Sequence, residues 1–180
     1  YKLDTRLRPS GNSGILVSSL DTYLNYHDSS ATWEHQALIK ARVIEGCGTS
    51  EWFKQVKDVL HRAVYEWNPP SDLNASINHL RKRKENELSR ETMDQRNIKE
   101  GRGGLLDVEY LTQALQLKYG GLYPQLQKPK TIEVLQELEK NAIIKKHESK
   151  VLQKNYIFLR LIENGLRLIY DDATNLLDFK

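Results

Sequence analysis

The chain has 180 residues, 39% of them hydrophobic and 28% charged, which is enough to bury the core of one domain. Its 27 basic and 24 acidic residues leave a net charge of +3, a bias that neither requires nor excludes nucleic acid as a partner. Apolar runs are only a few residues long and Cys47 is the single cysteine, so the sequence predicts no membrane span and no internal disulfide. We therefore expect a soluble, cytoplasmic protein.

The first 18 residues have the pattern of a β-ribbon. Residues 1–8 alternate in the manner of a strand. One face of this strand carries Lys2, Asp4, Arg6 and Arg8. Residues 9–14 are turn-forming, and residues 15–17 are a short apolar run that favours a second strand. Because two strands alone are barely stable, we expect this ribbon to be the end of a larger sheet that is mostly missing from the chain.

From Ser19 onward the hydrophobic spacing is that of helices. The predicted helices cover residues 19–26, 32–45, 50–67, 71–90, 105–119, 130–141 and 146–170. Residues 94–104 contain three glycines and are expected to form a loop. The prediction is therefore a mainly α protein, in which residues 1–18 end one domain and residues 19–180 form an all-α helical bundle. Any strand is expected within residues 1–18.

The polar face of the N-terminal strand combines one carboxylate with two guanidinium groups. Asp4, Arg6 and Arg8 share this face because strand residues two apart point to the same side. Carboxylate oxygens bind Mg²⁺ and arginines bind phosphates, so the three residues suit a site for a metal and a polyphosphate. The same spacing is also typical of a surface ladder of ion pairs.

Four segments, in order across nearly the whole chain, carry a resemblance to one enzyme family. They are YKLDTRLRPSG at residues 1–11, TWEHQALIKARV at residues 32–43, KEGRGGLLDVEYLTQ at residues 99–113 and NYIFLRLIE at residues 155–163. The first resembles the YxVDxRLRPxG signature of glutamine-synthetase adenylyltransferases, members of the polymerase-β-like nucleotidyltransferase superfamily. The third is similar to that family's KxGxGGLxDIEFLxQ.

The resemblance implies an enzyme that uses ATP and Mg²⁺ to transfer AMP to a tyrosine of glutamine synthetase, and so regulates nitrogen assimilation. It implies that Asp4 is catalytic and is the third of three carboxylates that bind two metal ions. Arg6 and Arg8 would bind the nucleotide phosphates. The other two carboxylates lie on an earlier strand of the family's fold, which this sequence does not contain. We therefore expect the chain to be a fragment that is inactive alone.

Two other functions remain open. Enzymes of this family carry two transferase units in tandem, one that adds AMP and one that removes it by phosphorolysis. WEHQAL at residues 33–38 resembles the adenylylating unit, and the deadenylylating unit is the alternative. A non-catalytic helical module that binds glutamine synthetase, or the nitrogen-signalling PII protein, is a third interpretation.

Lys40 lies close to the apolar face of the helix predicted from residue 32. Its alkyl stem either snorkels along that face, or its ammonium group reaches the transferase site and binds the nucleotide. We include Lys40 among the candidate nucleotide-binding residues for the second reason.

Four further patterns favour structural roles. The glycines of residues 101–104 precede a helix, as in a phosphate-binding loop, but they lack the Lys-Ser/Thr of a Walker motif. Asp107 and Glu109 are two apart on a helix and point in different directions, so they are not expected to share one metal. The basic run at residues 81–84 precedes acidic residues and lacks aromatic platforms, so a solvated face is favoured over a nucleic-acid site. Glu163 is expected to pair with Arg167 on the last long helix.

Overall fold

The computed structural model describes residues 8–44, 48–170 and 174–179. Asp4, Arg6 and most of the first expected strand lie outside these residues. The described elements are η1 (Gly11–Ser13), α1 (Leu20–His27), α2 (Thr32–Leu38), α3 (Ser50–Tyr65), α4 (Leu73–Leu88), β1 (Gln95–Asn97), α5 (Leu105–Tyr119), η2 (Pro124–Leu126), α6 (Thr131–Lys140), α7 (Lys146–Tyr170) and β2 (Leu176–Asp178). The prediction of a mainly helical protein is confirmed. Within the described ranges, no helix has both the length and the apolar character that a membrane crossing needs.

Local sequence signals account for where several helices begin and end. The Ser19 hydroxyl accepts a hydrogen bond from the backbone N–H of Thr22 at 3.2 Å, and so satisfies one free donor at the start of α1. Thr49 does the same for α3, through the N–H of Trp52 at 3.2 Å. The predicted bounds of α5 and α7 agree with the structure residue for residue.

The second helix is shorter than predicted, because α2 ends at Leu38 and not near residue 45. Residues 39–40 form a turn, closed by a hydrogen bond from the N–H of Ala41 to the Leu38 carbonyl at 2.9 Å. A longer helix would include the β-branched Ile44, which is 79% exposed and has little to pack against. The early end places Lys40 in a turn.

A two-stranded antiparallel sheet joins segments that are far apart in the sequence. Its register pairs Gln95 with Asp178, Arg96 with Leu177, and Asn97 with Leu176. The expectation that strands are confined to residues 1–18 is therefore wrong, and β1 lies in a segment expected to be a loop. The described residues 15–17 form no strand, and their side chains are 70–84% exposed. Three-residue strands show no period of their own, so only the distant partner defines them.

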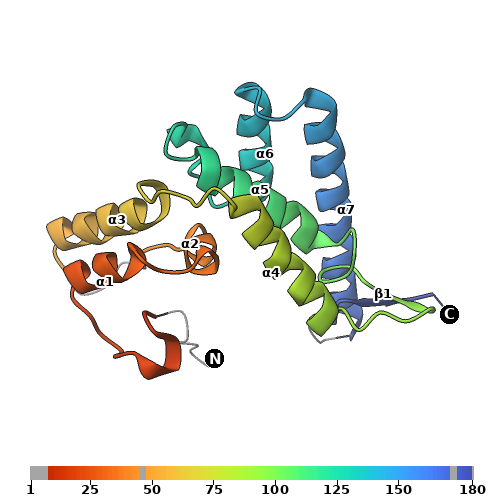
Figure 1. Cartoon of the computed structure of the whole chain (residues 1–180). Helices are drawn as coiled ribbons and strands as arrows, with labels where there is room; N and C mark the ends of the chain where they lie inside the picture. The colour runs from red at the N-terminus through yellow and green to blue at the C-terminus, as the bar shows by residue number, and fades with distance from the viewer. Residues whose placement is uncertain (1–7, 45–47, 171–173, 180) are drawn as a thin grey trace.

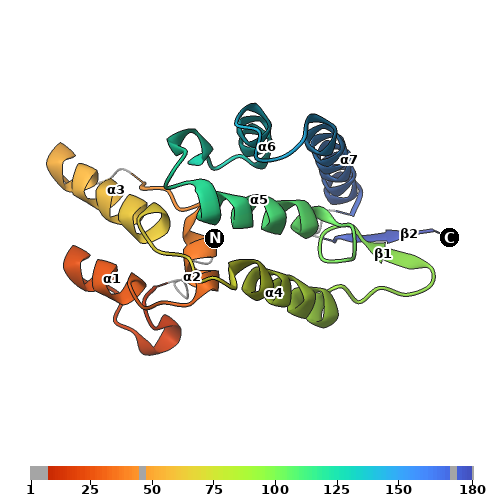
Figure 2. The ribbon, with the colours of Figure 1, turned by 45° about the horizontal axis from the view of Figure 1, so that its top comes forward.

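Helix α5 runs through the middle of the molecule, with α4 on one side and α6 and α7 on the other (Figures 1 and 2). It contributes to two hydrophobic clusters. The first comprises Leu105, Val108, Leu126, Val134, Leu135, Leu138 and Tyr156. The second comprises Ile39, Val64, Leu73, Ile77, Ala114 and Leu117. Because both clusters pack on α5, this helix fixes the end of α2 relative to α7.

Candidate functional site

Two adjoining hollows lie beside α2 and share the side chains of Trp33, Ala37 and Lys40. The smaller hollow has a volume of 240 Å³, and its lining also includes Arg8. The larger is a groove of 730 Å³ between α2, α4 and α5. Two of the expected site residues, Arg8 and Lys40, thus line the same hollow, whereas Asp4 and Arg6 lie outside the described residues.

Arg8 is held by the turn that follows it. Its Nε donates a hydrogen bond to the carbonyl of Gly14 at 3.0 Å, and its Nη2 donates to the carbonyl of Asn12 at 3.5 Å. A Cβ atom on Gly14 would lie 1.9 Å from the carbonyl oxygen of Pro9, so only glycine fits at this close approach. The turn-forming sequence therefore fixes the guanidinium group of Arg8 beside the smaller hollow.

Lys40, in the turn after α2, has a carboxylate partner on α5. Its Nζ lies 3.5 Å from Oε2 of Glu109 on α5, and the lysine side chain is 41% exposed whereas that of Glu109 is only 12% exposed. The stem of Lys40 lines both hollows. The ammonium group of Lys40 is therefore directed by its ion pair with Glu109, and does not only extend along an apolar face into solvent.

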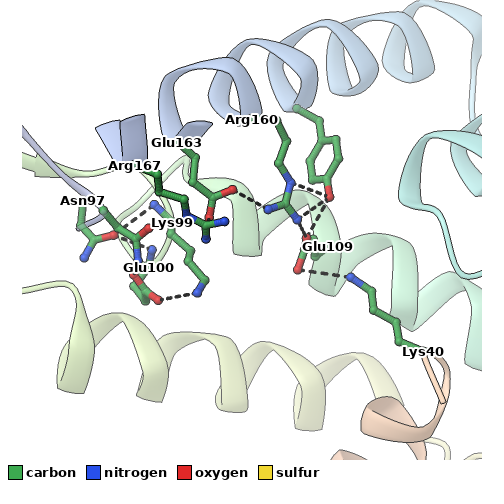
Figure 3. Close-up of polar contacts among 10 residues, drawn as sticks. Lys40, Asn97, Lys99, Glu100, Glu109, Arg160, Glu163 and Arg167 are labelled. Carbon is green, nitrogen blue, oxygen red and sulfur yellow. Dashed lines mark hydrogen bonds and ion pairs between the residues drawn. The ribbon is translucent and has the colours of Figure 1, made fainter. Parts of the chain in front are cut away.

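Glu109 belongs to a row of alternating charges that starts at Lys40 in the turn after α2 and continues through α5 to α7 (Figure 3). Its Oε1 accepts hydrogen bonds from the hydroxyl of Tyr156 at 2.9 Å and from Nη2 of Arg160 at 2.5 Å. Arg160 also pairs with Glu163 at 2.6 Å, and Glu163 pairs with Arg167 at 2.9 Å, which confirms the predicted pair. Glu163 is 1% exposed, so its charge depends on both arginines.

Two pKa shifts agree with this charge row. Burial lowers the pKa of Arg160, but hydrogen bonds to Tyr156 and Glu163 raise it by more, so the guanidinium stays charged. Burial raises the pKa of Tyr156, so its hydroxyl keeps the proton that it donates to Glu109. The sequence showed the spacing of the residues on α7, but the approach of Lys40 and Glu109 depends on how three helices pack.

The glycine-rich loop before α5 is held by internal contacts. Nη2 of the Arg81 side chain donates to the carbonyl of Gly101 at 2.7 Å, and its Nε lies 2.6 Å from Oδ1 of Asp107. Oδ2 of Asp107 accepts from the N–H of Gly103 at 2.6 Å, and Gly103 has a φ of +77°, which favours glycine. Arg81 is 5% exposed, so the prediction that the whole basic run is solvated is wrong for this residue. The contacts support the structural interpretation of the loop.

The other side of the same loop is braced by Asn97. Its Oδ1 accepts hydrogen bonds from the backbone N–H groups of Lys99 at 3.0 Å and Glu100 at 2.8 Å (Figure 3). The ammonium group of Lys99 lies 3.6 Å from Glu100. Asp107 therefore orients Arg81, whereas Lys99 pairs with Glu100.

A chain of hydrogen bonds lies at the back of the smaller hollow, and sequence reasoning missed it. Nδ1 of His27 is 3.1 Å from the Ser30 hydroxyl, which is 3.0 Å from Nε2 of His35. Nδ1 of His35 is 2.7 Å from the carbonyl of Ala63, and its ring stacks on Trp67 at a centroid distance of 3.8 Å. His27 lies on α1 and His35 on α2, so no local sequence pattern indicates that they are close, apart from the short link between the two helices.

The described residues contain no group of three or more His, Cys, Asp or Glu side chains that is placed to bind a metal ion. Asp4, the expected metal ligand, lies outside them.

Two family models divide the chain between them. The model described as glutamate-ammonia ligase adenylyltransferase matches residues 1–59, and the model described as GlnD PII-uridylyltransferase matches residues 71–180. Among curated proteins, the bifunctional glutamine synthetase adenylyltransferase/adenylyl-removing enzyme of Nitrosococcus oceani is 36% identical over 177 residues. That match covers 96% of this chain but 18% of the relative, so the chain spans less than a fifth of that protein's length.

Proposed function

Because the chain belongs to the glutamine synthetase adenylyltransferase family, we propose that it is part of an enzyme that transfers AMP from ATP to a tyrosine of glutamine synthetase. The observation that carries the proposal is the 36% identity over 177 residues to a protein named for adenylyl transfer and adenylyl removal on glutamine synthetase. Arg8 and Lys40 line the same hollow, and two positively charged side chains suit an anionic substrate, which supports the proposal.

The proposed reaction joins the tyrosine oxygen to the α-phosphorus of ATP. The phenolic oxygen attacks in line, the bond from the α-phosphorus to the bridging oxygen breaks, and pyrophosphate leaves. The phenolic proton passes to a base in the site. In this proposal Arg6 and Arg8 bind the phosphates and Lys40 binds the nucleotide from the end of α2. Mg²⁺ neutralises phosphate charge when it is bound, and Asp4 is its proposed ligand and the proposed catalytic carboxylate.

The proposal extends to the organisation of the parent polypeptide. Residues 1–18 would end a nucleotidyltransferase palm, and residues 19–180 would form the helical domain that follows it. Such an enzyme acts in the cytoplasm, where glutamine synthetase is its partner and a PII protein is a second candidate partner. The ion pair between Glu109 on α5 and Arg160 on α7 supports a helical domain whose helices are held in a fixed arrangement.

One specific observation favours a second candidate function. The family model that matches residues 71–180 carries the name of a PII-uridylyltransferase. The helices within residues 71–180 therefore also resemble a family that is named for the transfer of a uridylyl group to PII. Under this second proposal the transferred group is UMP from UTP, and PII is the acceptor.

The two proposals are separated by the full-length polypeptide that carries this chain. It is incubated with α-³²P-labelled ATP or UTP, and with purified glutamine synthetase or PII as acceptor. We expect label from ATP on glutamine synthetase, and γ-labelled ATP serves as the control that transfers none. Label from UTP on PII alone would favour the uridylyl proposal. Binding of glutamine synthetase without any transfer would favour the non-catalytic helical module.

Asp4→Asn then decides which transferase unit the chain represents. The substitution removes one negative charge at nearly constant volume, so we expect it to abolish AMP transfer without unfolding the protein. Removal is measured separately, by adding orthophosphate to adenylylated glutamine synthetase and recording the ADP formed. If Asp4→Asn blocks removal and leaves transfer intact, the chain belongs to the deadenylylating unit. Full activity in both assays would contradict any catalytic role for Asp4.

A further inference from the structure

Two glutamine side chains meet between α2 and α5. Nε2 of Gln36 on α2 donates a hydrogen bond to Oε1 of Gln113 on α5 at 2.7 Å. Gln36 is 6% exposed and Gln113 is 9% exposed. The hydrogen bond and the burial together hold both amide groups in one arrangement.

One hydrogen bond between two amides always leaves a carbonyl oxygen and an NH₂ group free. Here these are Oε1 of Gln36 and Nε2 of Gln113, which have no partner among the described residues. Exchanging oxygen and nitrogen in both amides would keep the bond and would still leave one acceptor and one donor. In the described part of the chain, the side-chain atoms that lack a hydrogen bond and that water cannot reach belong to His27, Arg81 and Asn175. Water therefore reaches both free amide groups.

Both glutamines line the 730 Å³ groove between α2, α4 and α5. This volume lies within the roughly 300–1,000 Å³ that is typical of ligand pockets. Because the rest of each glutamine side chain is covered, the groove is where a ligand can reach the free amide groups. The lining also includes Trp33 and Tyr110, and aromatic side chains are common around bound ligands.

The glutamine pair lies one helical turn from the ion pair between Lys40 and Glu109. Glu109 and Gln113 are four residues apart on α5, so they lie on the same side of that helix. Their partners Lys40 and Gln36 are also four residues apart. Lys40 lines both hollows, whereas Arg8 lines only the smaller and the glutamines only the larger. The two cations are therefore followed by a pair of neutral amides.

This order matches a nucleotide, whose phosphates are anionic and whose base is neutral. Adenine presents an amino donor beside a ring nitrogen that accepts, and a glutamine amide pairs with such an edge where proteins read DNA. Here Gln36 supplies the acceptor and Gln113 supplies the donor. A peptide unit is a poorer match, because its N–H and C=O point in opposite directions.

We propose that the groove binds the adenine of the nucleotide. The amino group of the base donates to Oε1 of Gln36, and a ring nitrogen accepts from Nε2 of Gln113. The phosphates then lie toward Lys40 and Arg8. This inference rests on the proposed AMP transfer and adds to it the two residues that select the base.

The test compares nucleotides that differ in the base. Calorimetry on the full-length polypeptide measures dissociation constants for ATP, UTP and purine riboside 5′-triphosphate, which lacks the amino group of ATP, each with Mg²⁺. We expect purine riboside triphosphate to bind about 3- to 10-fold more weakly than ATP, the effect of one hydrogen bond. In Gln36→Met, which has a similar volume but no acceptor, that ratio should fall to about 1.

Two further variants separate recognition of the base from a structural role. Gln36→Glu keeps an acceptor for the amino group, so the ratio should persist although the added charge weakens every nucleotide. Gln55→Met is the matched control, because Gln55 is exposed on α3 and lines neither hollow. It should retain the wild-type ratio.

Equal binding of ATP and purine riboside triphosphate by the wild-type protein would overturn the proposal, and this outcome does not depend on the folding of any variant. A ratio that persists in Gln36→Met would overturn it as well. In both cases, label that still passes from ATP to glutamine synthetase would leave the proposed function intact. Tighter binding of UTP than of ATP, or no binding of any nucleotide, would overturn the adenine site and the proposed AMP transfer together.

Discussion

Arg8 and Lys40 reach the same hollow by different routes. Arg8 is placed by a tight turn whose carbonyls accept from its guanidinium group. Lys40 is placed by the end of α2 at residue 38 and by its ion pair with Glu109. In both cases the protein supplies acceptors that orient the cation before any ligand arrives, which reduces the ordering cost of binding.

Arg8→Ala should reduce AMP transfer by the parent enzyme at least tenfold. The free energy of unfolding should change by only about 1 kcal/mol, because the variant loses hydrogen bonds to a surface turn. Arg8→Lys should also be impaired, since an ammonium group cannot make a bidentate phosphate contact. Activity and melting temperature are measured together, with Arg62→Ala on the exposed face of α3 as the control. Equal activity of Arg8→Ala and wild type would show that Arg8 only shapes the turn.

The buried histidine pair makes stability depend on pH. Burial lowers the pKa of His35 in the folded state, whereas in the unfolded chain it titrates near pH 6.5. Below that pH the unfolded state binds more protons, so stability should decrease as the pH falls from 7.5 to 5.5. Urea unfolding at the two pH values measures the loss, which should be smaller in His35→Gln than in wild type. A pH slope that stays unchanged in His35→Gln would contradict the argument.

At the scale of elements, α5 is the helix on which the molecule is organised. One of its faces packs on α6 and α7, and another packs on the α2–α4 side. Its Glu109 also connects Lys40 to the charges of α7. The packing of α6 against α5 therefore also affects the position of Lys40, because α5 carries its partner Glu109.

Leu138→Ala tests how strongly α6 holds this arrangement. Leu138 is fully buried in the cluster around α5, so the truncation leaves a cavity and should cost about 2–5 kcal/mol of the free energy of unfolding. Leu122→Ala is the matched control, because Leu122 is 77% exposed and its truncation should change stability by no more than about 0.5 kcal/mol. Urea unfolding measures both. Similar small losses in the two variants would mean that α6 is loosely packed.

At the scale of the whole molecule, the smaller hollow lies where the N-terminal segment meets the helices. The smaller hollow takes Arg8 from the start of the described chain, His27 from α1 and Lys40 from the end of α2. The larger groove extends from there to α4 and α5. A ligand in both hollows would therefore contact segments on either side of the proposed domain boundary at residue 18.

The isolated 180-residue chain should bind Mg²⁺ and ATP weakly or undetectably. It carries one of the three metal-binding carboxylates that the family resemblance implies, and a single carboxylate with a few cations does not hold two metal ions. Calorimetry on the chain, beside the full-length polypeptide, measures the difference. Tight, Mg²⁺-dependent binding of ATP by the isolated chain would show that the nucleotide site is complete within these residues.

The sequence by itself determined the helical class, the family and the bounds of α5 and α7. These features depend on local or repeated signals, namely the helical spacing of apolar residues, capping hydroxyls, and motifs whose letters can be compared directly. The pair between Glu163 and Arg167 belongs with them, because residues four apart on one helix always lie on the same side.

The tertiary structure alone decided the contacts between residues that are distant in the sequence. It paired β1 with β2, ended α2 early and buried Arg81 against the glycine loop. It also brought His27 to His35, and Lys40 to Glu109. Each of these depends on which helix packs against which, and on the desolvation that follows. The periodicity of one segment does not carry that information, because it does not show which distant residue a polar side chain contacts.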